Sequence, residues 1–232
     1  MVRGFYSAAA GVFCQQKSFN VISNNISNAS TSGFKCQSTS ESSFGEHFVS
    51  RMRENTAIGT GAFATVNNSC YTDISQGALE KTGKSVDMAI QGEGFFLVES
   101  NNHGEKLTRD GQFVIDNEGY LILPDNGRVL DKNKKSIRIR TSDFTVDAQG
   151  VIRENDREIA KLYIAVQDEG IKHADAQSYQ IIQGAIEKSN INIAKEISKM
   201  IAGQNHFQSC IQIIKMYDKI NEISANQIGR IS

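Results

Sequence analysis

The sequence predicts an α+β protein whose paired N- and C-terminal helices, coiled-coil-like, carry an inserted all-β domain, with an extended connector. Apolar residues repeat at helical spacing at both ends, the roughly 160 residues between them lack that repeat, and Asx-Gly turn signals recur late in the middle. We therefore expect four segments: an N-terminal helix of the helical core in 1–35, an extended connector in 36–83, an antiparallel β domain in 84–184, and the C-terminal helix of the core in 185–232.

The first helix is predicted over about residues 4–28. Its apolar residues recur in steps of three and four, interrupted by the polar Gln15: Phe5, Ala8, Val12, Phe19, Ile22 and Ile26. Beyond Ile26 the chain is rich in Ser, Thr and Asn, whose side chains compete for backbone hydrogen bonds, and Gly33 is a natural helix stop. The helix should therefore end near Asn28.

The middle of the chain divides into a connector and a β-rich region. Residues 36–83 are dense in Ser and Thr and lack a sustained period, which predicts an extended connector with strand content around Phe63–Val66. From residue 84, short apolar runs alternate with turns such as Asp110-Gly111, which is typical of an antiparallel sandwich or barrel. The expected strands include Val86–Ile90, Phe95–Val98, Phe113–Ile115, Tyr120–Leu123, Ile137–Ile139, Phe144–Val146, Val151–Ile152 and Lys161–Val166.

The last helix is predicted over about residues 190–229, capped by Asn190 or Asn192. Its apolar repeat resembles that of the first helix, with Gln204 interrupting: Ile193, Ile197, Met200, Phe207, Ile211 and Ile214. A helix of this length, roughly 55 Å, needs a partner along it. The two repeats predict the seam of a two-helix coiled coil, and Gln15 and Gln204 are expected to set the register between neighbours. On periodicity alone, a simple intramolecular hairpin in a monomer fits equally well.

Composition and charge narrow the function classes. The net charge of −1 gives no electrostatic case for nucleic acid or an anionic membrane. No stretch approaches the ~20 apolar residues that span a bilayer, and the run Ala8–Phe13 is too short for a good signal peptide. We expect no nucleic-acid partner and no membrane insertion, and either a cytosolic protein or one exported without a cleaved signal.

The sequence offers no catalytic, cofactor-binding or metal-ligating constellation. Its four histidines share no HxxxH or HExxH spacing, and its four cysteines form no CxxC. Gly92-Glu93-Gly94 begins like a dinucleotide-binding loop but predicts only a tight turn, since Phe95 follows and the third glycine is missing. The cysteines are expected to be free thiols, with a Cys14–Cys210 bridge as the alternative in an oxidising space.

Four blocks resemble those of the bacterial flagellar basal-body rod and hook–basal-body protein family, of distal-rod or proximal-rod type. Residues 20–35 look like its IANNLANxxTxGFK signature, 76–96 like the entry to its β domain, 108–113 like its TRxGxF turn, and 184–191 like the entry to its last helix. The matching positions are Asn24, Asn25, Asn28, Thr31, Gly33, Phe34, Lys35, Gln76, Gly77, Gly92, Gly94, Phe95, Phe96, Arg109, Gly111, Phe113, Ser189 and Asn190. The blocks follow the family's order along the whole chain, although Cys14 and Cys36 depart from the usual small or polar residues.

The resemblance implies a structural subunit and not an enzyme. Such a subunit leaves the cytosol through the flagellar export apparatus and assembles head-to-tail, with copies of itself and other rod and hook proteins. The product is a hollow helical drive shaft in the basal body, outside the cytoplasmic membrane. The expected assembly interface comprises Phe5, Val12, Phe19, Ile22, Ile26, Ile193, Ile197, Met200, Phe207, Ile211 and Ile214. The alternative is a coiled-coil stalk with a β head, acting as a surface or phage-tail binding module, which predicts a stable soluble trimer.

Overall fold

The computed structural model describes residues 2–43, 65–100, 104–124, 127–141, 144–155, 157–167, 171–174 and 178–228. The chain forms two compact units. The first comprises Met1–Ser27, Cys36–Asp73 and Ile191–Ser232, and the second comprises Asn28–Lys35 and Ile74–Asn190. A helix near each end and many strands between them confirm the α+β class.

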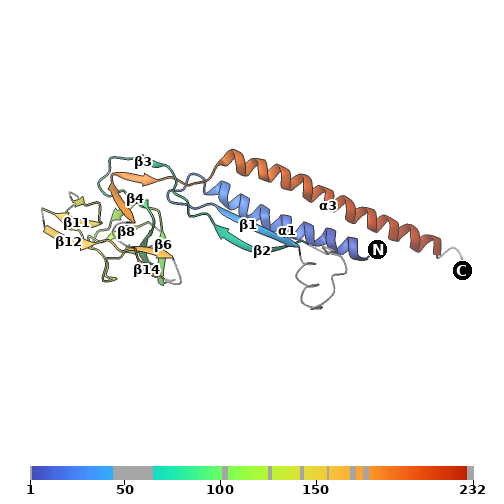
Figure 1. The fold of residues 1–232 in the computed structure, drawn as a ribbon, viewed down its shortest axis with the longest axis horizontal. Coiled ribbons are helices and arrows are strands. Elements are labelled where there is room, and N and C mark those ends of the chain that lie inside the picture. The colour runs from blue at the N-terminus through green and yellow to red at the C-terminus, as the bar shows by residue number, and fades with distance from the viewer. Residues whose placement is uncertain are drawn as a thin grey trace. The chain divides into compact units, whose positions relative to one another are not determined.

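Two long helices dominate the first unit. α1 (Val2–Ser27) and α3 (Ile193–Ile228) lie side by side and run in opposite directions (Figure 1). Of the two predicted caps for the last helix, Asn192 is used, because its side-chain oxygen accepts the Lys195 N–H at 3.1 Å. After α1 the backbone turns, and Gly33 adopts a φ of 66°, a left-handed conformation that ends helices at little cost for glycine.

The contact between α1 and α3 combines small and polar residues with a few large apolar ones, such as the rings of Phe19 and Phe207, whose centroids lie 6.0 Å apart. A side chain at Gly4 would overlap the Tyr217 hydroxyl, and one at Gly11 would lie 3.1 Å from the Cys210 sulfur. Asn25 hydrogen-bonds Glu196 at the other end of α1. Each step of seven or fourteen residues along α1 thus matches an equal step backwards along α3, and this row of contacts is the observed seam between the two helices.

The predicted seam is wrong in part, because Ile193 and Ile197 lie outside the contact with exposed fractions of 47% and 44%, and Phe5 is 36% exposed. The observed row that includes Gly4 and Gly11 precedes the predicted row of Phe5 and Val12 by one residue, a rotation of about 100° around the helix. Glycines permit the two backbones to approach more closely than large apolar residues do. The larger side chains therefore flank the seam: Ile22 is buried, whereas Val12, Phe19, Ile26, Met200, Phe207, Ile211 and Ile214 are half-buried.

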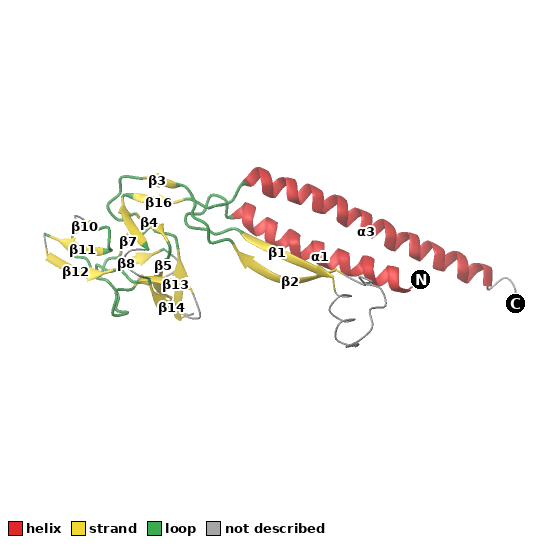
Figure 2. Ribbon diagram, in the orientation of Figure 1, coloured by secondary structure: helices red, strands yellow, loops and turns green. Residues whose placement is uncertain are grey.

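A β-hairpin completes the first unit. β1 (Gln37–Ser43) and β2 (Thr65–Thr72) pair antiparallel, and they lie beside α1 (Figure 2). These strands fall in the segment expected to be an extended connector. The strand content predicted around Phe63–Val66 coincides with the start of β2 at Thr65, whereas Phe63 and Ala64 lie outside the described residues.

The second unit is built from short strands whose pairings, among the described residues, are antiparallel. Its strands are β3 (Leu79–Lys81), β4 (Met88–Gly92), β5 (Phe95–Ser100), β6 (Gly104–Thr108), β7 (Val114–Ile115), β8 (Leu121–Leu123), β9 (Gly127–Val129), β10 (Thr145–Val146), β11 (Val151–Glu154), β12 (Arg157–Lys161), β13 (Ile164–Gln167), β14 (Ile171–His173), β15 (Tyr179–Gln183) and β16 (Ala185–Glu187). The largest sheet runs β14-β13-β5-β9-β8-β7, and β6 also pairs with β5. β10-β11-β12 form a second sheet, while β4 pairs with β15 and β3 with β16.

The second unit contains a large apolar core and a smaller buried cluster of Leu97, Leu130, Tyr163 and Ala165. Phe96 and Phe113 meet edge to face in the large core, with ring centroids 5.1 Å apart, among fully buried residues such as Leu121 and Ile152. The predicted strand Ile137–Ile139 is wrong: Arg138 makes only an isolated bridge to Tyr120, although Ile137 and Ile139 are buried. Alternating burial does not require a continuous ladder of backbone hydrogen bonds, so the pattern alone misleads there.

Candidate functional site

Two buried polar clusters contain many of the residues that resemble the family signatures. The Asn25 cluster, in the first unit, comprises Asn25, Gln37, Glu196 and Lys199. The Glu187 cluster, in the second unit, comprises Lys35, Gly77, Arg109 and Glu187. Each joins segments that are distant in the sequence but belong to the same unit.

Asn25 connects α1, β1 and α3. Its side chain is fully buried, and its amide donates to the Gln37 carbonyl at 2.7 Å and to Glu196 Oε2 at 3.0 Å. Its own oxygen accepts the Gln37 N–H at 3.0 Å. Lys199 Nζ donates to the other oxygen of Glu196 at 2.6 Å. The cluster therefore satisfies the polar groups of a buried helix–strand–helix junction.

The Glu196 carboxyl is held ionised by its partners. Burial alone would raise its pKa, but the hydrogen bonds from Lys199 and Asn25 outweigh that effect, and the pKa lies below the ordinary glutamate value. A carboxylate with a depressed pKa stabilises the folded state above the pKa of the unfolded chain, and that stabilisation is lost as the pH falls through the folded-state pKa.

Replacing Glu196 with Gln should reduce stability at neutral pH, and the difference from the wild type should close on acidification from about pH 5 to pH 3. Urea unfolding of the full chain, followed by far-UV circular dichroism at several pH values, measures this difference. Glu222→Gln is the matched control on the same helix, since Glu222 and Lys219 form an exposed pair at 3.2 Å. An equal pH dependence of the two variants would contradict the assignment.

Among the four members of the Glu187 cluster, Glu187 is the one that carries a carboxylate, and this carboxylate faces two cations. Lys35 Nζ lies 2.7 Å from Glu187 Oε1, and an Arg109 guanidinium nitrogen lies 3.1 Å from Oε2. The Gly77 N–H also donates to Oε1, at 2.8 Å. Glu187 is fully buried, and Lys35 and Arg109 are nearly so. The charges are thus paired inside the protein and not at its surface.

Backbone groups complete this cluster. Lys35 also donates to the Ser75 carbonyl at 2.7 Å, and Arg109 donates to the carbonyls of Ile90 and Gly92. The Gly33 N–H donates to the Glu187 carbonyl at 2.7 Å. Three segments of the second unit that adjoin the first unit in sequence therefore converge here: the one after α1, the one after β2 and the one before α3.

The remaining signature residues surround these clusters or build the β core. Gln76 bonds the backbone of Ile90 and Gly92, and Asn190 bonds Ser75. The Arg109 guanidinium stacks over the Phe95 ring at 5.2 Å. Gly94 and Gly111 lie against the backbone or side chains of the β unit, Phe96 and Phe113 are in its core, Asn28, Thr31 and Phe34 form the turn after α1, Ser189 adjoins Asn190, and Asn24 is exposed.

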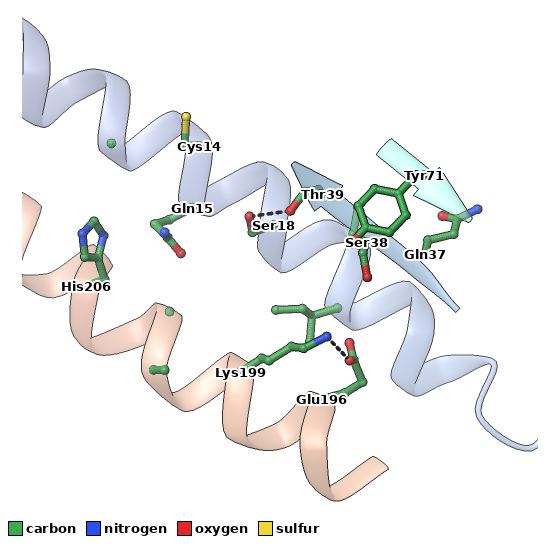
Figure 3. A pocket seen from close by; sticks show the side chains of 15 residues that line it. Cys14, Gln15, Ser18, Gln37, Ser38, Thr39, Tyr71, Glu196, Lys199 and His206 are labelled. Atoms are coloured by element: carbon green, nitrogen blue, oxygen red, sulfur yellow. Dashed lines mark hydrogen bonds and ion pairs between the residues drawn. The ribbon is translucent and has the colours of Figure 1, made fainter. Parts of the chain in front are cut away.

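A groove of about 580 Å³ lies in the first unit between α1, α3 and the hairpin (Figure 3). Its lining mixes apolar residues such as Val21 and Ile22 with polar ones such as Gln15, Lys199 and His206. The sulfur of Cys14 points away from the His206 ring (Figure 3), whose Nδ1 lies 3.9 Å from the sulfur of Cys210 instead. Among these lining residues we find no arrangement that would serve nucleophilic catalysis.

The described part of the chain also tests the expectations about a disulfide, a metal site and a membrane-spanning helix. All four cysteines lie within it, and none forms a disulfide, so the alternative Cys14–Cys210 bridge is absent from this structure. No group of three or more His, Cys, Asp or Glu side chains in that part is arranged to hold a metal ion. Neither of its long helices is apolar enough over a sufficient length to cross a bilayer.

Comparison with known proteins identifies two matching family profiles. The profile described as "Flagellar hook protein FlgE/F/G D1 domain" matches residues 89–205, which is half of the chain. The profile "Flagella basal body rod protein" matches residues 5–35. The second match includes Asn25 and Lys35, and the first includes Arg109, Glu187 and Glu196.

Several relatives match along nearly their whole length. The flagellar basal-body rod protein FlgG of Bacillus subtilis is 28% identical, over 95% of this chain and 97% of its own. FlgF of Caulobacter vibrioides is 29% identical, over 93% of this chain and 92% of its own. The flagellar hook-basal body complex protein FlhO of B. subtilis is 25% identical over the whole of both chains. The similarity is thus shared among flagellar rod and hook-basal body proteins of different names.

Proposed function

This chain belongs to the family of flagellar hook and basal-body rod proteins, and we propose that it is a structural subunit of the bacterial flagellar rod. Its copies would assemble head-to-tail into a hollow helical drive shaft that transmits torque. One observation carries this proposal: α1 and α3 approach closely at Gly4 and Gly11, and large apolar residues such as Ile193 and Ile197 remain exposed outside the pair. Such residues are suited to contacts between subunits.

The two units would have different tasks in the rod. We propose that α1 and α3 form a coiled-coil-like core that makes the main contacts between subunits, and that the β unit is a domain inserted into it. The β unit has its own apolar core, which supports an independent and rigid body. The Glu187 cluster would fix the three converging segments to that body. No step in this function requires enzymatic chemistry.

The partners and location follow from the same proposal. The chain would contact copies of itself and other flagellar rod and hook proteins, after delivery by the flagellar export apparatus. It would lie in the basal body, outside the cytoplasmic membrane. The assembly interface would include the predicted residues that the structure leaves most accessible, namely Phe5, Ile193 and Ile197.

Ile197→Asp tests the proposed assembly interface. Because Ile197 is 44% exposed, the variant should fold, yet a buried charge at a subunit contact should prevent assembly. We expect export of the variant without rod formation, so that cells producing it as their only copy do not swim. Swimming assays and immunoblots of fractionated cells measure the two effects.

Ser198→Asp is the matched control for this test. Ser198 is the next residue of α3 and is exposed on a different side of the helix, so the same charge there should leave motility intact. Normal swimming of the Ile197→Asp cells would refute the proposed interface. Failure of both variants to accumulate would instead indicate a folding defect, which far-UV circular dichroism of the purified chains detects.

A further inference from the structure

The outer surface of α3 carries two separate apolar stripes. The first, stripe A, comprises Ile193, Ile197 and Ile201 near the start of the helix, with exposed fractions of 44–56%. The second, stripe B, comprises Ile213, Met216, Ile220 and Ile223 near its end, with exposed fractions of 44–63%. At about 100° per residue, the stripes lie roughly a third of a turn apart around the helix, and the seam with α1 takes the remaining third.

Each stripe becomes polar where the other is apolar. Continuing along the side of stripe A, α3 presents Gln204, Gln208 and Lys215, which are exposed. On the side of stripe B, the earlier positions are Ser198, Asn205 and Ser209, which are exposed as well. Both sides of the helix are therefore half apolar and half polar, in opposite order along the axis.

Stripe B also extends past the start of α1. Gly4, in the first turn of α1, packs against Tyr217, whereas α3 continues to Ile228 (Figure 1). By the register of the helix pair, Ile223 therefore lies beyond the level of Val2, the first described residue of α1. An apolar surface in this position is available to another molecule.

We propose that stripe A of one copy of this chain packs against stripe B of the next copy, with the two α3 helices parallel and staggered. The centres of the stripes, near residues 197 and 218, are 21 residues apart, which corresponds to a stagger of roughly 30 Å. Without a stagger, Lys215 and Lys219 of one copy would lie against Met216 and Ile220 of the other. The alternation of polar and apolar halves thus selects both the partner and the offset.

This contact is heterologous, because it joins two different surfaces of the same chain. A heterologous contact that does not close on itself adds copies without limit and forms a filament. Both complementary surfaces are on this chain, so a second copy suffices as the occupant. The inference rests on the proposed function and adds the register of neighbouring subunits to it.

Site-specific photocrosslinking tests the stagger. In cells that make a tagged and an untagged form of the chain, Ile201→p-benzoyl-phenylalanine should give a dimer-sized product that contains both forms. Mass spectrometry should locate the linkage within residues 213–223 of the second copy. The reciprocal variant, Ile220→p-benzoyl-phenylalanine, should link to residues 193–201. The benzophenone group is apolar, so it preserves the character of either stripe.

The control variant is Ser198→p-benzoyl-phenylalanine, at the same height on α3 but on the side of stripe B, and it should give no linkage to residues 213–223. Links from Ile201 to stripe A of a second copy, or to the α1 of a second copy, would overturn the staggered contact. If the cells that give such links still swim, the proposed rod function is not contradicted. Chains that never form dimer-sized products and are dispensable for swimming would overturn both the contact and the proposed function.

Discussion

Replacing Glu187 with Gln should lower the free energy of unfolding of the β unit by about 3–5 kcal/mol, because two buried cations would lose the counter-charge that they share. Lys35 and Arg109 both contact the Glu187 carboxylate and are at most 8% exposed. Gln has nearly the same volume as Glu, so the change tests charge and hydrogen bonding and not packing. Lys35 and Arg109 would retain their backbone carbonyl partners, which do not neutralise a charge.

Chemical denaturation of the full chain measures this loss. Tyr163 and Tyr179 are buried in the β unit, so near-UV circular dichroism can follow its unfolding. Glu80→Gln is the matched control, since Glu80 and Lys188 form an ion pair at 2.8 Å with side chains about half exposed. An exposed pair of this kind contributes about 1 kcal/mol or less. Equal losses in the two variants would show that the buried cluster does not anchor the β unit.

The sequence predicts the terminal helices well because their ends are marked locally. Asn192 caps α3, and the polar run with Gly33 follows α1, so each boundary falls within a few residues of its expected position. The residues at which the two helices meet are harder to predict from the sequence. Apolar periodicity favours the largest side chains, whereas the helices meet where Gly4, Gly11 and Gly203 allow close approach. The predicted stripes flank the contact for this reason.

The β1–β2 hairpin could not be predicted from alternation of apolar and polar residues. β1 reads QSTSESS and β2 reads TVNNSCYT, so neither strand has an apolar face of sustained period. Antiparallel backbone pairing, from Gln37 opposite Thr72 onwards, defines the hairpin instead. Strands with this composition need neighbours to stabilise them, and such tertiary contacts are not visible in a local pattern.

The candidate site illustrates a further difference between a signature and its geometry. The family resemblance identifies Asn25, Lys35 and Arg109 as notable, but it does not show which residues they contact. Asn25 meets Glu196 across 171 residues of sequence, and Lys35 meets Glu187 across 152. Glu187 stands in the block 184–191 and Glu196 in the first turn of the last helix, but neither position indicates which residues these glutamates contact. Only the fold brings these charged and polar partners together.

Replacing Asn25 with Ala should destabilise the helical unit by about 3 kcal/mol, because it leaves several buried groups without their partner. The Gln37 N–H, the Gln37 carbonyl and Glu196 Oε2 all bond the Asn25 amide at 2.7–3.0 Å. Each buried polar group that loses its hydrogen bond costs about 1–3 kcal/mol. Alanine's better helix propensity, about 0.5 kcal/mol, offsets only a small part of that loss.

The adjacent residue provides an unusually close control for this prediction. Asn24 precedes Asn25 in α1 and belongs to the same signature, but it is exposed, and its contact with the Gln37 side chain is long at 3.5 Å. Asn24→Ala makes the same chemical change and gains the same helix propensity, so it should alter stability by about 0.5 kcal/mol or less. Urea unfolding followed by far-UV circular dichroism compares the two variants. If both behave alike, the junction of α1, β1 and α3 does not depend on the buried amide. If only Asn25→Ala unfolds readily, the second asparagine of the signature is the one that holds the helical core together.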